Sequence, residues 1–224
     1  ADVIRELEHS SRVGIHAKVE KIDWDKISKR MWSQINESKD IQKNLSNVEG
    51  LDVYEGIGEF TGKKSLRVKL NETDDYTDEF KAKRIVLANG GRPAIPSIEG
   101  IEKVDYITSE TFFGDKFPNT LWDSLILIGG GIIAAEFAHI FSSFGVKVTV
   151  LEMLPRLVST EEPEISEILE KEFKKYMNVH TNTRAIKVRE ENNEKIVTGE
   201  NRETGEKMEF KGDALFISAG RIPN

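Results

Sequence analysis

The sequence predicts an α/β fold, and three features of the chain lead to that prediction. Apolar runs alternate with helical patterns between residues 124 and 180, which is typical of a parallel sheet. A glycine triplet, residues 129–131, separates the first run from the first helix. A plan of an apolar strand ending in Ala, Gly, Arg and Pro occurs twice, in residues 80–93 and 210–223. We interpret this repetition as two copies of one supersecondary unit, and therefore as two related domains.

The first half of the chain begins with helical patterns and then changes its period. Residues 1–12 have helical apolar spacing, and Gly14 ends that pattern. A second helix opens at residues 22–25, where Asp23 or Asp25 can serve as the N-cap, and an exposed polar segment is expected over residues 36–47. Short strands separated by polar turns are then predicted at residues 53–54, 56–60, 66–70 and 80–87.

A connector containing three turn-forming residues, Pro96, Gly100 and Pro118, covers residues 94–119. We place the domain boundary near its end and predict domains at residues 1–117 and 118–224. The second domain is predicted to run in the order strand, helix, strand, helix, strand, three-stranded meander and strand, at residues 124–128, 132–144, 147–152, 163–176, 179–180, 184–210 and 214–218. This order is that of a Rossmann-like nucleotide-binding domain with a β-meander.

The glycine triplet has the residue types that a dinucleotide site requires. Gly129 permits a tight turn after the strand, and Gly131 lets backbone N–H groups approach a pyrophosphate at the helix N-terminus. Ala134 is the small residue at which helix and strand pack closely. Glu152 ends the next strand about 20 residues further on, where an acid reaches the adenosine ribose hydroxyls. The motif therefore predicts a dinucleotide-binding site.

Composition excludes several other functions. The chain has 224 residues and a net charge of −7, which argues against binding nucleic acid. Its longest apolar run, residues 125–135, is too short to span a bilayer, and no secretory signal is visible, so the expected location is the cytoplasm and no membrane partner is predicted. There is no cysteine, and the four histidines show no ligand spacing, so no metal site is predicted.

Four segments of the chain resemble one family. Residues 129–138, 215–224, 85–93 and 56–62 are similar to motifs of the flavin-dependent pyridine nucleotide–disulfide oxidoreductases of class I, which include dihydrolipoamide dehydrogenase, glutathione reductase, mycothione reductase and mercuric reductase. The resemblance covers nearly the whole chain. In the segment 85–93, Asn89 replaces the family's usual threonine. The resemblance implies a nucleotide-binding domain together with part of a related flavin-binding domain.

The family's N-terminal flavin motif, its redox cysteine pair and its C-terminal dimerisation domain have no counterpart in residues 1–224. We therefore expect this chain to be a middle fragment of an enzyme that is a homodimer when intact. The chain is expected to be inactive by itself, with no catalytic residue of its own. It can be a piece of a longer protein or a natural truncation.

The resemblance also implies the residues that bind cofactors. The backbone of Ile128–Ala134 is expected to hold the pyrophosphate of NAD, Glu152 the ribose, and Ala185 and Gly220 the adenine and nicotinamide ends. Glu136 is similar to an acid that faces the flavin. The complete expected NAD set is Ile128, Gly129, Gly130, Gly131, Ile132, Ile133, Ala134, Glu136, Glu152, Ala185 and Gly220. The expected FAD set is Gly58, Asn89, Gly90 and Gly91.

The coenzyme and substrate class depend on conflicting features. A carboxylate at Glu152 favours NAD(H) over NADP(H), and we expect Arg156 to be a surface residue that does not alter this preference. Residues 151–157 resemble dihydrolipoamide dehydrogenases, whereas residues 134–142 resemble mycothione reductases. We favour a dihydrolipoamide dehydrogenase-like enzyme that passes hydride between NAD(H) and FAD for dithiol/disulfide exchange. The alternatives are an NADPH-linked glutathione or mycothione reductase, a non-catalytic nucleotide-binding homologue, and a relative of the NADH oxidases.

Overall fold

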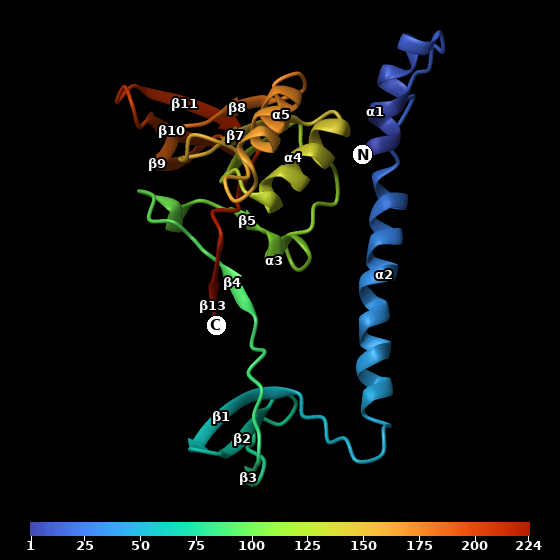
Figure 1. Cartoon of the computed structure of the whole chain (residues 1–224), viewed down its shortest axis with the longest axis vertical. Helices are drawn as coiled ribbons and strands as arrows, with labels where there is room; N and C mark the ends of the chain where they lie inside the picture. Colours follow the sequence, from blue (N-terminus) through green and yellow to red (C-terminus); the bar gives the residue numbers. More distant parts are fainter. The chain divides into compact units, whose positions relative to one another are not determined.

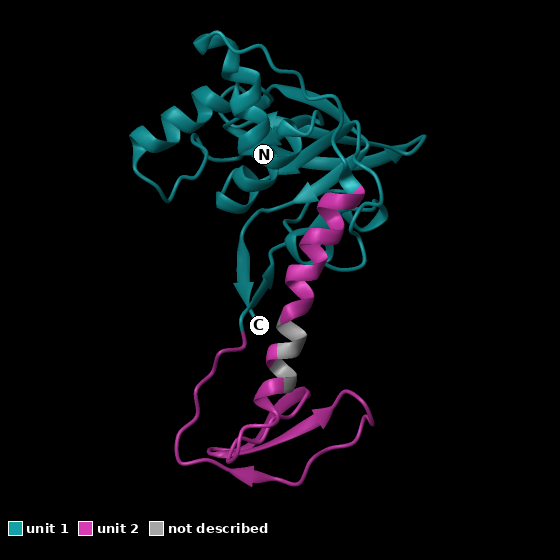
Figure 2. Ribbon diagram, turned by 90° about the vertical axis from the view of Figure 1, so that its right-hand side faces the viewer, with its two compact units in different colours: residues 1–24, 90–224 teal, residues 25–89 magenta. Residues whose placement is uncertain are grey.

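The computed structural model describes residues 1–37, 41 and 44–224. The chain forms two compact units (Figure 2). The first unit contains residues 1–24 and 90–224, and the second contains residues 25–89. Among the described residues, no helix combines the length and the apolar character needed to cross a membrane.

A five-stranded parallel sheet forms the centre of the first unit (Figure 1). Its strands lie in the spatial order β5, β12, β6, β7, β8, where β5 is Ile107–Thr108, β12 is Ala214–Ile217, β6 is Ser124–Ile128, β7 is Lys147–Leu151 and β8 is Asn178–His180. Four of these strands were predicted, and the alternating order of strands and helices confirms the predicted α/β fold class. The central strands β12 and β6 are almost entirely apolar because both faces of the sheet are covered there.

Two layers cover the sheet, one on each face (Figure 1). Leu125, Leu127 and Phe216 pack on one face in a core that includes residues of α4 (Ile132–Ser143) and α5 (Pro163–Phe173). Ile126 and Leu215, which point the opposite way, pack in a second core with the antiparallel meander. The meander consists of β9 (Thr183–Glu191), β10 (Glu194–Asn201) and β11 (Lys207–Gly212). The carboxyl ends of β6, β7 and β12 lie together at one edge of the sheet, which the two layers leave open.

The connector contributes to the sheet, which the sequence pattern did not indicate. Residues 94–119 contain η2 (Ile101–Lys103), β5 and the short helix α3 (Ser109–Phe112), whose N-cap Thr108 accepts a hydrogen bond from the Thr111 N–H. The strand β5 is only two residues long, too short for any periodicity to reveal. The partition of the chain into compact units thus differs from the predicted division at residues 117 and 118, which stays a prediction.

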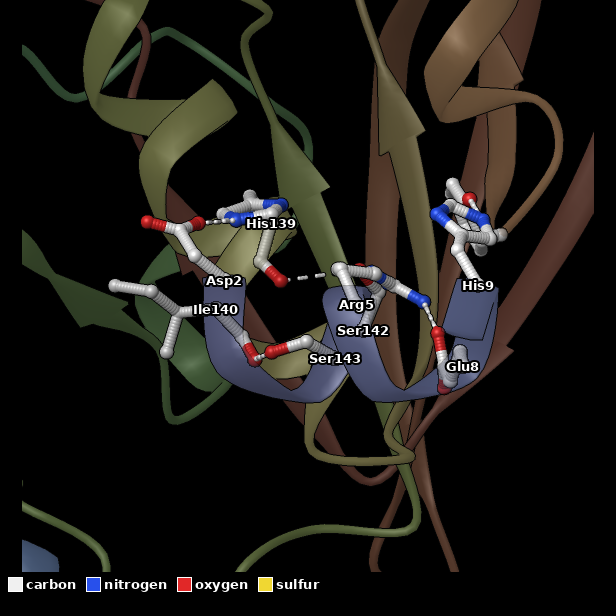
Figure 3. Close-up of polar contacts among 9 residues, drawn as sticks. Asp2, Arg5, Glu8, His9, His139, Ile140, Ser142 and Ser143 are labelled. Atoms are coloured by element: carbon white, nitrogen blue, oxygen red, sulfur yellow. Dashed lines mark hydrogen bonds and ion pairs between the residues drawn. The ribbon is translucent and has the colours of Figure 1, made fainter. Parts of the chain in front are cut away.

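The first helix, α1 (Asp2–His9), is attached to α4 by polar side chains (Figure 3). Asp2 pairs with His139 at 2.8 Å between Oδ1 and Nε2, and this hydrogen bond lowers the pKa of Asp2. The Arg5 guanidinium donates to Ser142 Oγ at 2.8 Å and lies 3.8 Å from the ring centre of Tyr176. Each residue of α1 is at least partly exposed, so electrostatic and aromatic contacts, rather than apolar burial, hold this helix. A short 3-10 turn, η1 (Ser10–Val13), follows and ends at Gly14 as predicted.

The second unit contains a three-stranded antiparallel sheet of β1 (Gly56–Gly62), β2 (Ser65–Leu70) and β3 (Phe80–Lys81). The helix α2 spans Trp24–Leu45 and so continues into residues 36–47, where a polar segment was expected. Residues 38–40, 42 and 43 of that range lie outside the described residues.

One strand prediction in the second unit is wrong, and another is too long. The structure, which describes residues 53–54 and 80–87, has no strand at 53–54 and ends β3 at Lys81. The apolar residues that follow are highly exposed, at 88% for Val86 and 70% for Leu87. A strand requires a hydrogen-bonding neighbour along its length. Within residues 82–87, the described part of the chain has one backbone–backbone hydrogen bond, from the Ala82 N–H to the Lys64 carbonyl at 3.1 Å, and no strand pairing.

The two copies of the repeated plan end in a shared ribbon. β4 (Gly91–Pro93) and β13 (Arg221–Pro223) pair in antiparallel register, with Arg221 opposite Pro93 and Pro223 opposite Gly91. Both strands belong to the first unit. The matching ends of the two copies therefore lie side by side.

Candidate nucleotide-binding site

A cavity of about 640 Å³ opens at the carboxyl ends of the parallel strands. In open α/β sheets this edge is where ligands bind. The walls come from the glycine turn, the end of β7 with the loop after it, the start of β9, and the segment that follows β12. The lining residues are Pro96, Ile98, Ile128, Gly129, Gly130, Gly131, Ile132, Ile133, Leu151, Glu152, Met153, Leu154, Ser159, Thr160, Thr183, Arg184, Ala185, Ser218, Ala219 and Gly220.

The glycine turn joins β6 to α4. Its first two positions have no room for a residue larger than glycine. Gly129 has a φ of 109°, and a Cβ there would lie 2.4 Å from the Ser218 carbonyl oxygen. A Cβ on Gly130 would lie 2.7 Å from Leu157 Cδ2 and 2.8 Å from Glu152 Cβ. The turn is therefore packed against both the end of β12 and the end of β7.

Gly131 differs from the other two glycines. It is the N-cap of α4, and none of the described side chains caps this helix end. No described heavy atom lies within 4 Å of the position that a Cβ on Gly131 would take. The helix therefore presents uncapped N–H groups and its positive dipole end to an open part of the cavity, an arrangement suited to a phosphate group.

Glu152 is buried at the end of β7 and is joined to the glycine turn. Its carboxylate accepts hydrogen bonds from the N–H of Gly130 and, at 2.6 Å, from the N–H of Leu154. Its own backbone N–H donates to the His180 carbonyl at 2.9 Å. Only 7% of Glu152 is exposed. Each carboxylate oxygen can accept more than one hydrogen bond, so the group keeps acceptor capacity for hydroxyl groups entering the cavity.

The ring of His180 supports this edge of the sheet and is expected to make stability depend on pH. It packs edge-on against Phe210, with ring centres 4.7 Å apart. Burial, with a smaller contribution from Lys174, lowers the pKa of His180 below its ordinary value of 6.5. Between the ordinary and the lowered pKa, His180 is protonated in the unfolded chain and neutral in the folded chain. The contribution of His180 to stability is therefore complete above its ordinary pKa and is lost as the pH falls through its lowered pKa.

We therefore expect the melting temperature to fall as the pH is lowered through 6.5, the ordinary pKa of histidine, and His180→Gln to reduce that fall. Differential scanning calorimetry at a series of pH values measures it. The control is the same substitution at an exposed histidine, His16→Gln. An unchanged pH dependence in His180→Gln would contradict the assignment.

The structure brings most of the expected NAD-binding residues to one cavity. The residues that line it are Ile128, Gly129, Gly130, Gly131, Ile132, Ile133, Glu152, Ala185 and Gly220. Ala134, in the first turn of α4, is 1% exposed and is not among the lining residues. Glu136 is exposed on α4 and is not among the lining residues.

The four expected FAD-binding residues do not line this cavity. Gly58 lies in β1 and Asn89 ends the second unit, whereas Gly90 and Gly91 belong to the first unit. Gly90 has a φ of 65°. A Cβ on Gly91 would lie 2.7 Å from the Ile222 carbonyl oxygen, so this glycine is required by the β4–β13 ribbon.

Sequence reasoning missed about half of the lining. Pro96 and Ile98 come from the connector, where no motif marked them. Met153, Leu154, Ser159 and Thr160 come from the loop after Glu152, a position that suggests contact with a ligand at that strand end. Arg156, which was expected at the surface, lies in the same loop. It is half-buried, and its Nη1 atom is buried with no hydrogen-bond partner in the described part of the chain.

Comparison with known proteins identifies the family. The model of the pyridine nucleotide-disulphide oxidoreductase family matches residues 6–224, so this chain belongs to that family. The match confirms the resemblance drawn from the motifs.

Several characterised proteins are similar to the chain. Mycothione reductase of Mycobacterium tuberculosis is 32% identical over 157 residues, which cover 67% of this chain and 32% of the relative. Mercuric reductase of Staphylococcus aureus is 30% identical over 86% of this chain and 33% of its own length. Dihydrolipoyl dehydrogenase of Acholeplasma laidlawii is 29% identical over 90% of this chain and 57% of its own length. The chain thus spans from about a third to just over half of these relatives.

A solved structure has the same fold. The HOCl-induced flavoprotein disulfide reductase RclA from Escherichia coli superimposes with a TM-score of 0.77 and 24% identity. The alignment covers 99% of this chain and 46% of that chain.

Proposed function

We propose that the chain is the nucleotide-binding middle part of an NAD-linked flavin disulfide oxidoreductase, similar to dihydrolipoamide dehydrogenase. The observation that carries this proposal is the buried carboxylate of Glu152, which lines the cavity beside the glycine turn. In such an enzyme, hydride passes between NAD(H) and FAD, and the flavin connects it to dithiol/disulfide exchange. The contribution of residues 1–224 is to bind and orient the nucleotide.

The cavity has the chemistry that a dinucleotide requires. The uncapped N-terminus of α4 at Gly131 would hold the pyrophosphate, because N–H groups and the helix dipole both favour negative charge. Glu152 would accept hydrogen bonds from the ribose hydroxyl groups. Apolar side chains such as Ile98, Ile128 and Leu151 provide walls for the adenine ring. A carboxylate beside the ribose would repel a 2′-phosphate, which supports NAD(H) over NADP(H).

We further propose that residues of the predicted first domain, 1–117, form part of a flavin-binding domain. The repeated plan makes Val86 and Leu87 the counterparts of Phe216 and Ile217, which are 0% and 1% exposed within the parallel sheet. Their own exposure of 88% and 70% is what a sheet strand would show without its neighbours. Residues outside 1–224 would supply that sheet, with Gly58, Asn89, Gly90 and Gly91 contacting FAD.

An NADPH-linked reductase of the mycothione or glutathione type is a second candidate. The observation that favours it is the 32% identity with a mycothione reductase. In both candidates the substrate is a disulfide or dithiol, and the intact enzyme is a cytoplasmic homodimer. Because residues 1–224 contain no cysteine, the chain by itself would not carry out disulfide exchange.

Titration of the chain with NADH and with NADPH, followed by calorimetry, tests the proposal. We expect NADH to bind about tenfold or more tightly than NADPH, because the Glu152 carboxylate accepts from two hydroxyl groups and repels a phosphate. Tighter binding of NADPH would favour the second candidate. If neither nucleotide binds, the proposed nucleotide site in this chain is wrong.

A further inference from the structure

The backbone of Val158 is held in a conformation that valine rarely adopts. Its φ is 41°, in the left-handed region, where a β-branched side chain crowds its own backbone. Val158 is nevertheless buried, with 6% of its surface exposed, in the core beneath α4 and α5. A conformation of this kind persists only where surrounding contacts impose it, and such residues cluster at functional sites.

Hydrogen bonds on both sides of Val158 impose the conformation. Its N–H donates to the Gly130 carbonyl at 2.7 Å. Its own carbonyl accepts from the Glu161 N–H at 2.8 Å and from the Ser166 hydroxyl, which is fully buried at the start of α5, at 3.4 Å. Val158 therefore connects the glycine turn to the helix α5 across the loop that follows Glu152.

The hydrogen bond from Val158 to the Gly130 carbonyl also affects the N–H of the next residue, Gly131. The Gly130 carbonyl and the Gly131 N–H belong to one planar trans peptide group, in which the C=O and N–H bonds point in opposite directions. When the Val158 N–H fixes the carbonyl, it also fixes the direction of the Gly131 N–H. That N–H has no acceptor among the described residues, and Gly131 lines the cavity.

Glu152 fixes the preceding peptide group in the same way, by accepting from the Gly130 N–H. Two successive peptide planes of the glycine turn are thus held from outside the turn. One is held by the carboxylate at the end of β7, and the other by the backbone of Val158.

We propose that Val158 is a positioning residue of the nucleotide site, whose left-handed backbone aims the Gly131 N–H at a phosphate group of the dinucleotide. The inference rests on the proposed function, because it assumes that the cavity receives a dinucleotide. It assigns the role to the backbone conformation and N–H of Val158 and not to its side chain.

Two substitutions at Val158 distinguish the role of its backbone from the role of its side chain. Val158→Gly keeps the N–H and permits the left-handed conformation without strain. Val158→Pro removes the N–H and restricts φ to about −65°, which forbids that conformation. The measurements on residues 1–224 are the NADH dissociation constant, by calorimetry, and the carbonyl-carbon chemical shift of Gly130 without nucleotide, which reports the hydrogen bond that this carbonyl accepts from Val158.

We expect Val158→Gly to keep the wild-type NADH dissociation constant and Gly130 carbonyl-carbon shift. We expect Val158→Pro to weaken NADH binding about tenfold, equivalent to about 1.4 kcal/mol, and to move the Gly130 carbonyl-carbon shift, because the hydrogen bond to that carbonyl is lost. Wild-type affinity in Val158→Pro, or an equal loss in both variants, would overturn the proposal, since an equal loss points to side-chain packing. If the wild-type chain binds no NADH, the proposed function fails, and the Gly130 carbonyl-carbon shifts alone decide whether Val158 orients the glycine turn.

A third variant covers the case in which Val158→Pro does not fold. Val146 is buried to a similar degree, at 3% exposed, in the same core, and its φ is not positive. Val146→Gly and Val158→Gly therefore remove the same buried side chain, but only the second also relieves strain. We expect a smaller drop in melting temperature for Val158→Gly. An equal or larger drop would show that Val158 is not strained and would overturn the proposal.

Discussion

Replacing Gly129 with alanine is expected to disrupt the nucleotide domain, while replacing Gly131 is expected to leave it folded. Alanine at position 129 would need a φ of 109°, and its Cβ would lie 2.4 Å from the carbonyl oxygen and 2.7 Å from the carbonyl carbon of Ser218. Neither backbone atom can move without shifting the end of β12. We expect Gly129→Ala to cost about 3 kcal/mol of unfolding free energy.

Gly131→Ala is the matched control for this loss of stability. Gly131 has a φ of −76°, which suits any residue, and its Cβ would meet no described atom within 4 Å. We expect its unfolding free energy to change by no more than about 0.5 kcal/mol. The added methyl group would stand in the cavity beside the uncapped helix end, so nucleotide affinity should fall.

Urea denaturation and NADH titration of the two variants measure these effects. Equal stability of Gly129→Ala and Gly131→Ala would contradict the geometry of the turn. Unchanged NADH affinity in a folded Gly131→Ala variant would contradict the placement of a phosphate at the N-terminus of α4.

The second large effect is expected from Glu152→Gln. In the wild type, the Glu152 carboxylate accepts hydrogen bonds from the N–H groups of Gly130 and Leu154. The glutamine amide has only one acceptor oxygen, because its other terminal group is NH₂. One of these donors would face the NH₂ group and lose its partner. The ribose hydroxyl groups would likewise lose a charged acceptor. Hydrogen bonds to charged groups contribute about 1.5–3 kcal/mol each, so NADH affinity should fall about tenfold or more. NADPH affinity should fall less, because the repulsion of a 2′-phosphate is removed.

Glu164→Gln is the matched control, since it removes the same charge from an exposed position in the first turn of α5. We expect it to bind both nucleotides as the wild type does. Calorimetric titrations of both variants provide the comparison. A similar loss of NADH affinity in the two variants would mean that net charge, and not the contact of Glu152, governs binding.

The nucleotide domain could be predicted element by element because its local signals agree with its tertiary contacts. Strands such as β6 and β7 lie between a layer of helices and a meander, so nearly every residue in them is apolar and the runs are visible. The helix α4 begins at the glycine turn and ends before Gly145, which has a φ of 87°. The predicted boundaries of these elements differ from the observed ones by a few residues at most.

The segment 80–87 shows where local signals are insufficient. Its residues have the β-branched and apolar composition of a strand, yet only Phe80 and Lys81 pair in the structure. Propensity describes what a segment can do next to a suitable neighbour. The identity of that neighbour is a property of the rest of the fold, and for Val86 and Leu87 no neighbour is present among the described residues.

The sequence by itself determined the α/β class, the glycine turn with its acid Glu152, and the family, because each depends on residue types at fixed spacings along the chain. Only the tertiary structure decided which residues surround the cavity with them. Ile98, Thr160 and Ser218 come from three separate loops and meet because the sheet brings its strand ends to one edge. The same is true of Val158, whose backbone bond to Gly130 depends on the path of a whole loop. Contacts between distant segments follow from how the layers pack, and spacing along the chain does not encode them.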